Sequence, residues 1–276
     1  MLKFARWLRH GPLRGWSPLW TFLGRFYRFL IGVTGTKSPA SSHIGPYGPF
    51  KFDAKFAFSD FSSFGTGKNG GLTPCVNAAT GARCVLDIGA HIGLVSLPVC
   101  GVLAPGGRLY AFEPGDINRA FLSRHMELNG IKNANVLGHV VSDECLAEVE
   151  FFVQKGDSSM NSLAVRNGRG GYESVVKQQI SLDSFCDDKG LSPDVMKIDV
   201  EGAEIKVLRG ARETIRKNKP VMFLSVHKKE IAQLGGSLEE LLALIHDLDY
   251  EIFDFDNNIV HALKTDEYLV SPRPAN

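Results

Sequence analysis

Short apolar segments alternate with stretches of helical periodicity from residue 83 onward. The segments that predict buried strands are 84–88, 108–112, 135–141, 195–198 and 221–226, with 149–153 as a hairpin strand. Apolar positions that recur every three to four residues predict helices over 92–103, 116–129, 203–217 and 237–248, and Asp116 is expected to cap the second of these. Strands that alternate with helices pair in parallel through right-handed crossovers, so the predicted fold class is α/β. Segments 250–255 and 268–270 are expected to close the same sheet.

The length of the chain limits how many domains it can form. A chain of 276 residues, 44% of them hydrophobic, is long enough for one sizeable α/β domain and a short appendage. Residues 35–49 are rich in Gly, Ser and Pro, which indicates a linker. We therefore expect an N-terminal segment over residues 1–49 and a catalytic domain over residues 50–276, with the Phe-rich run 50–64 forming short strands or a hairpin over the core.

The N-terminal segment is basic and amphipathic. Residues 1–52 contain eight Lys and Arg residues and no Asp or Glu. Within residues 16–33, apolar side chains recur at helical spacing, and Arg25 and Arg28 fall on the opposite side. Its charge-free runs are about ten residues long, whereas a membrane span needs about 20. Two interpretations stay open: peripheral contact with an anionic membrane surface, or an accessory helix that covers the catalytic domain or a dimer interface.

The rest of the chain is acidic. Because the net charge of the whole chain is +1, the eight positive charges before residue 53 leave −7 for residues 53–276. Such a body would repel nucleic-acid phosphates, so a nucleic-acid substrate is not expected. The five cysteines form no C-x-x-C pair and no spacing typical of a metal site. We expect free, buried thiols in a cytoplasmic protein, and the cysteines predict no metal site; a divalent ion elsewhere stays open.

Two acidic motifs that contain glycine follow predicted parallel strands, where ligands of open α/β sheets bind. The first is Asp87-Ile88-Gly89-Ala90-His91-Ile92-Gly93, whose glycines allow a sharp turn. Its spacing is not G-x-G-x-x-G, so a pyrophosphate-containing nicotinamide cofactor is not predicted. Glu113 ends the second strand, where it can accept both ribose hydroxyls of a nucleoside ligand. The second motif is Lys197-Ile198-Asp199-Val200-Glu201-Gly202-Ala203-Glu204, after the fourth strand.

Five motifs of the chain resemble the successive motifs of the FkbM family of S-adenosylmethionine-dependent methyltransferases. They are the two motifs above, Ala111-Phe112-Glu113-Pro114, Asn161-Ser162 and Ser181-Leu182-Asp183. The resemblance covers residues 70–270. It implies a Rossmann-like class I methyltransferase sheet of seven mostly parallel strands, with an antiparallel last strand and helices on both faces. It also implies methylation of a hydroxyl, often on a sugar or a polyketide-type natural product. Two departures are His91, where the family commonly has Asn, and Ser225, where it commonly has Glu.

The predicted cofactor site places S-adenosylmethionine across the first three strand ends. Asp87 is expected to bind the amino group of the cofactor directly or through water, and the loop amides together with His91 to meet its carboxylate. Ser142 and Asp143, at the end of the third strand, are expected to lie beside the adenine. The predicted cofactor-binding residues are Asp87, Gly89, His91, Gly93, Glu113, Ser142 and Asp143.

The predicted catalytic residues are Asp199, His227 and Glu201. A carboxylate at Asp199 could orient or deprotonate the acceptor hydroxyl, and His227, at the next strand end, is the other candidate base. Glu201 and Glu204 could serve the acceptor or bind a divalent ion together with Asp199. Glu204 could equally interact only with the helix dipole. Lys197, inside the strand, is expected to neutralise a carboxylate.

Two other classes of function stay open. The first is a metal-assisted hydrolase that uses Asp199, Glu201 and Glu204, although no His-rich ligand set accompanies them. The second is a non-catalytic, membrane-associated binding module with the same fold. No Asn/Asp-Pro-Pro-aromatic run follows the fourth strand, which favours oxygen over nitrogen as acceptor. We expect a small-molecule or glycan acceptor. Its selection would depend on residues 50–71, on residues 154–178 and on the surroundings of Ser225 and His227. The sequence identifies neither the acceptor nor the oligomeric state.

Overall fold

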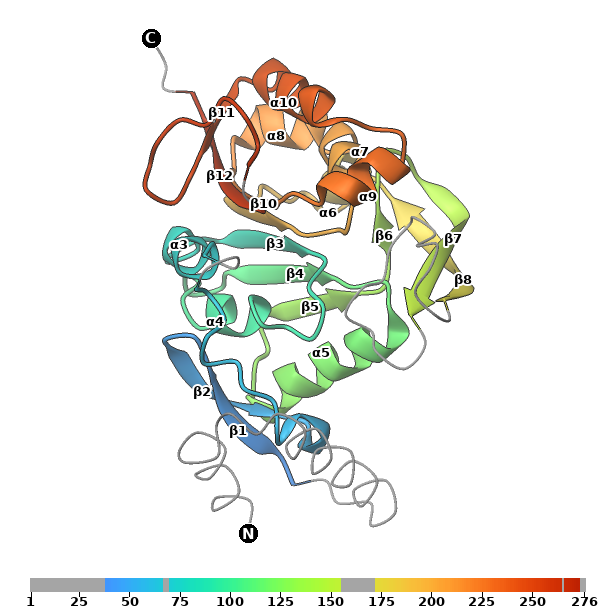
Figure 1. The fold of residues 1–276 in the computed structure, drawn as a ribbon. Helices are drawn as coiled ribbons and strands as arrows, with labels where there is room; N and C mark the ends of the chain where they lie inside the picture. The colour runs from blue at the N-terminus through green and yellow to red at the C-terminus, as the bar shows by residue number, and fades with distance from the viewer. Residues whose placement is uncertain (1–37, 67–69, 155–171, 265, 274–276) are drawn as a thin grey trace.

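A seven-stranded sheet forms the centre of the molecule (Figure 1). The computed structural model describes residues 38–66, 70–154, 172–264 and 266–273. The strand order is β11-β12-β10-β9-β3-β4-β5. The bounds of these strands are β3 (Cys84–Ile88), β4 (Arg108–Phe112), β5 (Ala134–Leu137), β9 (Val195–Ile198), β10 (Val221–Ser225), β11 (Tyr250–Phe253) and β12 (Glu267–Pro272).

Strand direction and register place the predicted motifs at one edge of this sheet. β12 is antiparallel to both of its neighbours, and the other neighbouring pairs are parallel. This arrangement confirms the predicted mostly parallel sheet with an antiparallel last strand. Asp87 on β3 pairs in register with Ala111 on β4 and with Lys197 on β9. The residues that follow these three strands therefore emerge side by side.

Helices cover both faces of the sheet, as predicted. One face packs against α3 (Leu72–Ala78), α4 (Ser96–Cys100) and α5 (Asp116–Leu128). The other face packs against α6 (Leu182–Lys189), α7 (Glu204–Arg209), α8 (Arg212–Asn218), α9 (Lys228–Gln233) and α10 (Leu238–Asp247). Successive residues of a strand point to opposite faces, so Val85 belongs to the first core and Leu86 to the second. The sheet is thus buried on both sides.

Two smaller sheets flank the central one. β1 (Ala40–Ile44) and β2 (Tyr47–Phe52) form an antiparallel hairpin that leads to a 3-10 turn, η1 (Ala54–Phe56). Ile44 and Phe52 of this hairpin are completely buried. The boundary expected at residue 50 therefore falls inside β2, and residues 40–49 form strands where a linker was expected. The division into an N-terminal segment and a catalytic domain stays a prediction, because the helix expected over residues 16–33 lies outside the described residues.

The third predicted strand, over 135–141, is wrong in its second half. The strand ends at Leu137 as β5, and β6 (Val140–Val141) joins β7 (Leu146–Gln154) and β8 (Tyr172–Ile180) in a separate sheet of order β6-β8-β7. Gly138 lies at the break, where a Cβ atom would come within 2.6 Å of the Arg119 guanidinium. The close approach of α5 to this glycine marks the point where the chain leaves the central sheet.

The helices predicted over 203–217 and 92–103 are also shorter than expected. α7 ends at its C-cap Gly210, and α8 begins at Arg212. A Cβ atom at Gly210 would lie 2.0 Å from the carbonyl oxygen of Ser142, so only glycine fits at this break. α4 begins only at Ser96, because His91 and Gly93 have positive φ angles of 50° and 94°, which are not helical.

The cap predicted at Asp116 is wrong, since Gly115 is the N-cap of α5 and Asp116 is its first residue. None of the described helices is both long enough and apolar enough to cross a membrane. All five cysteines are free, and four of them are buried, whereas Cys145 is exposed.

Candidate functional site

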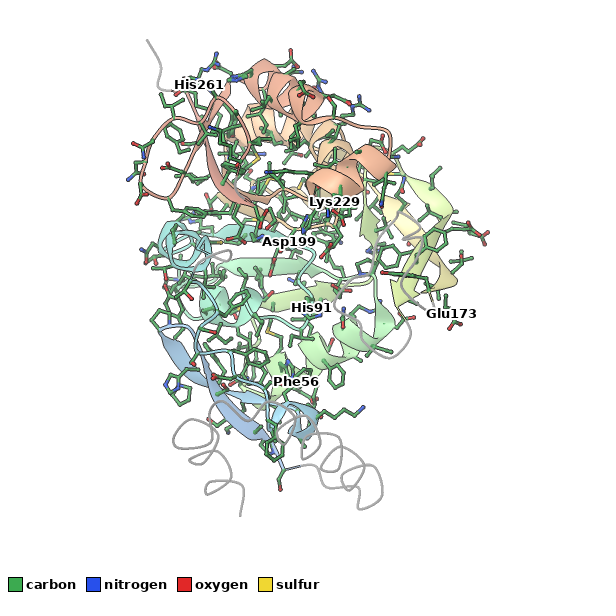
Figure 2. All side chains as sticks on the ribbon, in the orientation of Figure 1. Phe56, His91, Glu173, Asp199, Lys229 and His261 are labelled. Carbon is green, nitrogen blue, oxygen red and sulfur yellow. The ribbon has the colours of Figure 1, made fainter. Side chains whose placement is uncertain are left out.

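A cleft opens at the carboxyl ends of β3, β4 and β9. It contains about 1060 Å³ of empty space, including its mouth. Both predicted motifs contribute to its walls, and Figure 2 labels one residue of each, His91 and Asp199. The predicted residues that line it are Asp87, Gly89, His91, Glu113, Asp199 and Glu201. The register of the three strands thus brings together side chains that are up to 114 positions apart in the sequence.

The loop after β3 fits closely against the loop after β9. Gly89 has a φ angle of 88°, and a Cβ atom there would lie 1.8 Å from the carbonyl oxygen of Asp199. Glycine is therefore required at this position for two reasons, backbone conformation and space. Gly93 also has a positive φ angle, but it packs on Leu122 and does not line the cleft. Its role in the described structure is to shape the turn.

Asp87 lies at the base of the cleft and is 2% exposed. The hydroxyl of Ser96, the first residue of α4, donates a hydrogen bond of 2.5 Å to Asp87 Oδ2. Burial raises the pKa of Asp87 to about 6, against the opposing effects of this hydrogen bond and of the positive charge on Lys197. A cationic ligand group beside Asp87 would stabilise its charged form.

Glu113 connects the ends of β3 and β4. Its Oε2 accepts a hydrogen bond of 2.9 Å from the backbone N–H of His91, and its Oε1 accepts one of 2.9 Å from the N–H of Gly115. Burial raises the pKa of Glu113 to about 7, and these hydrogen bonds, with one from Asn118, oppose the rise. Each carboxylate oxygen has two lone pairs, so Oε2 can still accept a hydrogen bond from a ligand, whereas Oε1 also accepts one of 3.5 Å from Asn118 Nδ2.

Ser142 and Asp143, the predicted adenine neighbours, do not line the cleft. Their positions follow from the early end of the third strand, because β6 turns away into the second sheet. The Ser142 hydroxyl donates to Asp143 Oδ1 at 2.9 Å, and Asp143 lies 3.8 Å from Lys206 Nζ on α7. The wall at this end of the cleft is formed instead by His139, Val140, Val141 and Phe151.

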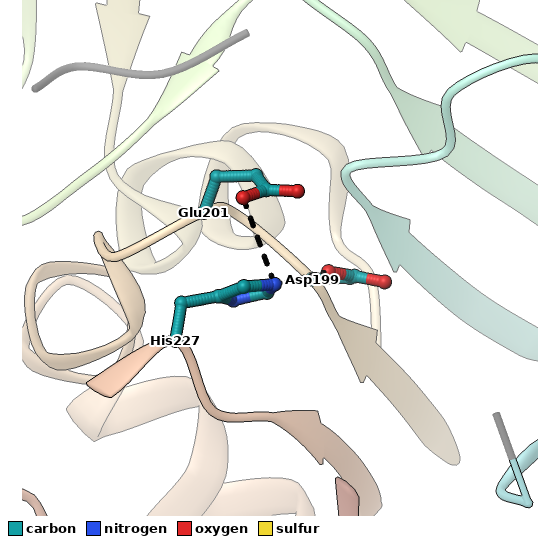
Figure 3. Close-up of side chains that lie close together, drawn as sticks. All are labelled: Asp199, Glu201 and His227. Atoms are coloured by element: carbon teal, nitrogen blue, oxygen red, sulfur yellow. Dashed lines mark ion pairs between the residues drawn. The ribbon is translucent and has the colours of Figure 1, made fainter. Parts of the chain in front are cut away.

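Asp199, Glu201 and His227 converge beside the cleft (Figure 3). His227 follows β10, and its Nε2 lies 3.6 Å from Asp199 Oδ1 and 3.7 Å from Glu201 Oε2. Glu201 has a φ angle of 53°, a left-handed conformation that is uncommon for residues other than glycine. All three predicted catalytic residues therefore lie in one cluster.

Glu204 contacts the imidazole of His227 on the side away from Asp199 and Glu201. It is completely buried, and its Oε1 lies 2.7 Å from His227 Nδ1. The same oxygen accepts a hydrogen bond of 3.1 Å from the N–H of Gly202. Glu204 is also the first residue of α7, so its charge interacts favourably with the helix dipole. Both alternatives considered for Glu204, a dipole partner and a site residue, are compatible with this position.

Lys197 is the buried cation beneath the cluster. Its Nζ donates to Ser225 Oγ at 2.6 Å and lies 3.2 Å from Asp199 Oδ2 and 3.9 Å from Glu267 Oε1. The prediction that Lys197 neutralises a carboxylate is confirmed. Glu267, which sequence reasoning missed, comes from β12 and also approaches Ser225 Oγ at 3.4 Å. It supplies a carboxylate next to the position where the resembling family commonly has Glu and this chain has Ser225.

Neighbouring charged groups determine the protonation states of Asp199 and His227. For Asp199, burial would raise the pKa, but Lys197 and His227 outweigh it and hold the pKa below its ordinary value. For His227, burial would lower the pKa, but Glu204, Asp199 and Glu201 outweigh it and raise the pKa to about 9. In the ligand-free protein at neutral pH, Asp199 is therefore a carboxylate and His227 an imidazolium.

The chain is similar to known methyltransferases over almost all of the residues that line the cleft. A family model described as the methyltransferase FkbM domain matches residues 87–252, which include both motifs of the cleft. The AMB antimetabolite synthetase AmbE of Pseudomonas aeruginosa is 28% identical over 61% of this chain and 9% of its own length. The methyltransferase sdnD of Sordaria araneosa is 33% identical over 47% of this chain and 60% of its own length.

One solved structure to which this chain is similar is also that of a methyltransferase. Methyltransferase FkbM from Methylobacillus flagellatus KT is 22% identical and has a TM-score of 0.44, with 70% of this chain and 44% of that chain covered. The chain thus spans less than two thirds of each of these three relatives. The family match does not favour the hydrolase or the non-catalytic binding module.

Proposed function

Because the chain belongs to the FkbM family of S-adenosylmethionine-dependent methyltransferases, we propose that it transfers a methyl group to a hydroxyl oxygen of a sugar, a glycan or a small natural product. The observation that carries the proposal is that acidic residues from different strand ends line one cleft. Asp87 and Glu113 come from the ends of β3 and β4, and Asp199 and Glu201 follow β9. The first pair suits a cationic nucleoside-containing donor, and the second pair suits a hydroxyl acceptor.

The donor would be held by the ends of β3 and β4. One ribose hydroxyl would donate to Oε2 of Glu113, and the other would replace the long hydrogen bond that Asn118 donates to Oε1. The backbone N–H groups of His91 and Gly115 hold this carboxylate in place. The amino group would meet Asp87, directly or through water, and Ser96 fixes the orientation of that carboxylate. The His91 amide is already used by Glu113, so the carboxylate of the donor would meet the other groups of this loop. The adenine would lie toward Val140 and Val141, which line the cleft.

The transfer would be a displacement in line with the carbon–sulfur bond. The acceptor oxygen forms a bond to the methyl carbon while the carbon–sulfur bond breaks, and the sulfonium becomes a neutral thioether. The attacking hydroxyl becomes strongly acidic as its oxygen donates electrons, so a weak base suffices. Asp199, an ionised carboxylate whose side chain is 37% exposed, would orient the hydroxyl and take its proton. His227 and Glu201 would position the acceptor around Asp199.

Calorimetric titration of the full chain with S-adenosylmethionine tests donor binding directly. The expected result is saturable binding of one cofactor per chain, and absence of binding would overturn the proposal. Transfer of a labelled methyl group from the cofactor into small molecules and glycans of a cell extract would then identify the acceptor class. Asp199→Asn should abolish transfer and leave cofactor affinity within about threefold, because Asn cannot take the proton.

Asp143→Asn is the matched control for Asp199→Asn. Asp143 is also an aspartate after a strand, but it contacts Ser142 and Lys206 and does not line the cleft. The variant should retain both transfer and cofactor binding. A loss of cofactor affinity in Asp143→Asn would instead support the original assignment of this residue to the adenine site.

A further inference from the structure

We propose that Asp199, Glu201 and His227 form a binding site for a divalent transition-metal ion on the acceptor side of the cleft. One ligand atom from each residue can be chosen so that all three lie within 4.8 Å of one another. The role of the ion rests on the proposed methyl transfer, but its binding does not.

The distances in the cluster fit a common ion. His227 Nε2 lies 3.6 Å from Asp199 Oδ1 and 3.7 Å from Glu201 Oε2 (Figure 3). Oxygen and nitrogen ligands bind such ions at about 2.0–2.2 Å, so two ligands of one ion lie roughly 3.0–3.5 Å apart. The ligand atoms of Asp199 and Glu201 lie within 4.8 Å of each other, so side-chain movements of up to about an ångström would complete the ligand set. The side chains of Glu201 and His227 are both only 24% exposed, so their positions are largely fixed by their surroundings.

The partner of the other imidazole nitrogen supports the same interpretation. The oxygen Oε1 of Glu204 lies 2.7 Å from His227 Nδ1. When a metal ion displaces one proton of the imidazolium, this contact keeps the other proton on Nδ1 and leaves the lone pair of Nε2 directed toward Asp199 and Glu201. A carboxylate behind the imidazole is the usual environment of a metal-binding histidine, because it fixes the ring and increases its basicity. Glu204 is completely buried, and its second oxygen has no hydrogen-bond partner among the described residues.

The charges around the cluster also favour a cation. Three carboxylates, those of Asp199, Glu201 and Glu204, surround His227. The ammonium group of Lys197 contacts only Asp199 among these three. A divalent ion bound to Asp199 and Glu201 would compensate the excess negative charge. This compensation would come from the side that faces the cleft, where both carboxylates form part of the lining.

The donor set indicates the class of metal. Imidazole favours first-row transition metals over Mg²⁺ and Ca²⁺, and the two carboxylates are compatible with Mn²⁺, Fe²⁺, Co²⁺ or Zn²⁺. Three protein ligands leave coordination positions open, as in catalytic rather than structural sites. Because Asp199 and Glu201 line the cleft, the open positions would face the acceptor. An acceptor oxygen that occupies one of them would be oriented for attack.

Titration of the chelator-treated full chain with Co²⁺ tests the site. Calorimetry and the visible absorption of Co²⁺ should both show one site per chain with mixed oxygen and nitrogen ligands. Glu201→Gln and His227→Gln each remove a ligand and should weaken Co²⁺ binding about tenfold or more. Glu204→Gln should weaken it about tenfold to a hundredfold, because Glu204 orients the imidazole and does not bind the ion itself. Glu173→Gln is the matched control, because Glu173 is an exposed residue of β8 (Figure 2), and it should not change the affinity.

Titration of the same preparations with S-adenosylmethionine separates this inference from the proposed function. Variants that still bind the cofactor are folded, so their loss of Co²⁺ binding reports on the ligands. Absence of Co²⁺ binding to a chain that binds the cofactor, or unchanged affinity in Glu201→Gln and His227→Gln, overturns the metal site and leaves the proposed function intact. Co²⁺ binding that depends on these residues in a chain that does not bind the cofactor supports the metal site and overturns the proposed function.

Discussion

Gly89 lies against the backbone of Asp199 so closely that a Cβ atom on Gly89 would be 1.8 Å from the Asp199 carbonyl oxygen. The contact joins the loop after β3 to the loop after β9. It therefore fixes the donor side of the cleft relative to the acceptor side. A larger residue could be accepted only if one of the two backbones moved.

Gly89→Ala should consequently destabilise the protein by about 3 kcal/mol or more. This loss is the sum of two costs, that of a positive φ angle for alanine and that of a steric clash with the backbone of Asp199. Chemical denaturation measures the free energy of unfolding. Gly81→Ala is the matched control, since Gly81 has a φ angle of 77° but a Cβ atom added there would have no other atom within 4 Å. It should cost only about 1 kcal/mol. Equal losses in the two variants would show that the contact with Asp199 has no separate effect.

Glu113 should make the stability of the ligand-free protein depend on pH. Its pKa is raised from 4.5 to about 7, chiefly by burial, so the folded protein retains a proton that the unfolded chain has already released. Stability should therefore fall as the pH rises from about 4.5 to about 7, by at most roughly 3 kcal/mol from this group. Hydrogen bonds from His91 and Gly115 and the charge of Arg119 act in the opposite direction and are included in this net shift.

Glu113→Gln should reduce this slope, as measured by denaturation at pH 5 and pH 7.5. Asp87 contributes a slope of the same sign, because its pKa is raised to about 6, so some dependence on pH should remain. Glu127→Gln, on the exposed side of α5, should leave the slope unchanged. If stability depends on pH equally in Glu113→Gln and in the unmodified protein, the Glu113 carboxyl is not the group that retains a proton in the folded state.

The sequence predicted the central sheet well and its periphery less well. The predicted bounds of β3, β4 and β9 agree with the structure to the residue, because each is a mostly apolar segment that is directly followed by Gly or by a charged residue. The helix predicted over 203–217 breaks at Gly210, where the backbone meets Ser142. A contact between positions so far apart leaves no trace in the local periodicity of either segment.

The same distinction applies to the site. Asp87, Glu113 and Asp199 could be predicted because each directly follows or ends a correctly identified strand. Ser142 was assigned to the cleft through a third strand that in fact divides into β5 and β6. Ser96 was missed because a single serine in an apolar run does not reveal that its hydroxyl points at a buried carboxylate.

Ser96→Ala should weaken the donor side of the cleft. The variant removes the hydroxyl that donates to Asp87 Oδ2 at 2.5 Å and leaves a buried carboxylate with one partner fewer. We expect a loss of about 1–3 kcal/mol in stability and a weaker affinity for S-adenosylmethionine, because the carboxylate that would meet its amino group is no longer fixed. Denaturation and calorimetric titration measure the two effects. Ser123→Ala, at an exposed position of α5, should change neither, and an unaltered cofactor affinity in Ser96→Ala would argue against a role of Asp87 in binding.

Lys197 should contribute more to stability than a lysine at the surface. It is 5% exposed, and Asp199 and Glu267 both lie within 4 Å of its ammonium group. Lys197→Met removes the ammonium group that both carboxylates share, and the loss of one partner of a buried ion pair costs about 3–5 kcal/mol. Lys206→Met is the matched control, because the Lys206 side chain is 40% exposed and lies 3.8 Å from Asp143, so its loss should cost less than about 1 kcal/mol.

A double-mutant cycle with Glu267→Gln identifies the cause of the Lys197 effect. If uncompensated negative charge destabilises Lys197→Met, removal of the charge on Glu267 should restore part of the stability, and the double variant should be more stable than the sum of the single losses predicts. Additive losses would mean that Lys197 stabilises the sheet through packing of its aliphatic chain and its bond to Ser225. Because β12 carries Glu267 and β9 carries Lys197, a positive coupling energy would also show that the antiparallel last strand is electrostatically coupled to the strand that precedes Asp199.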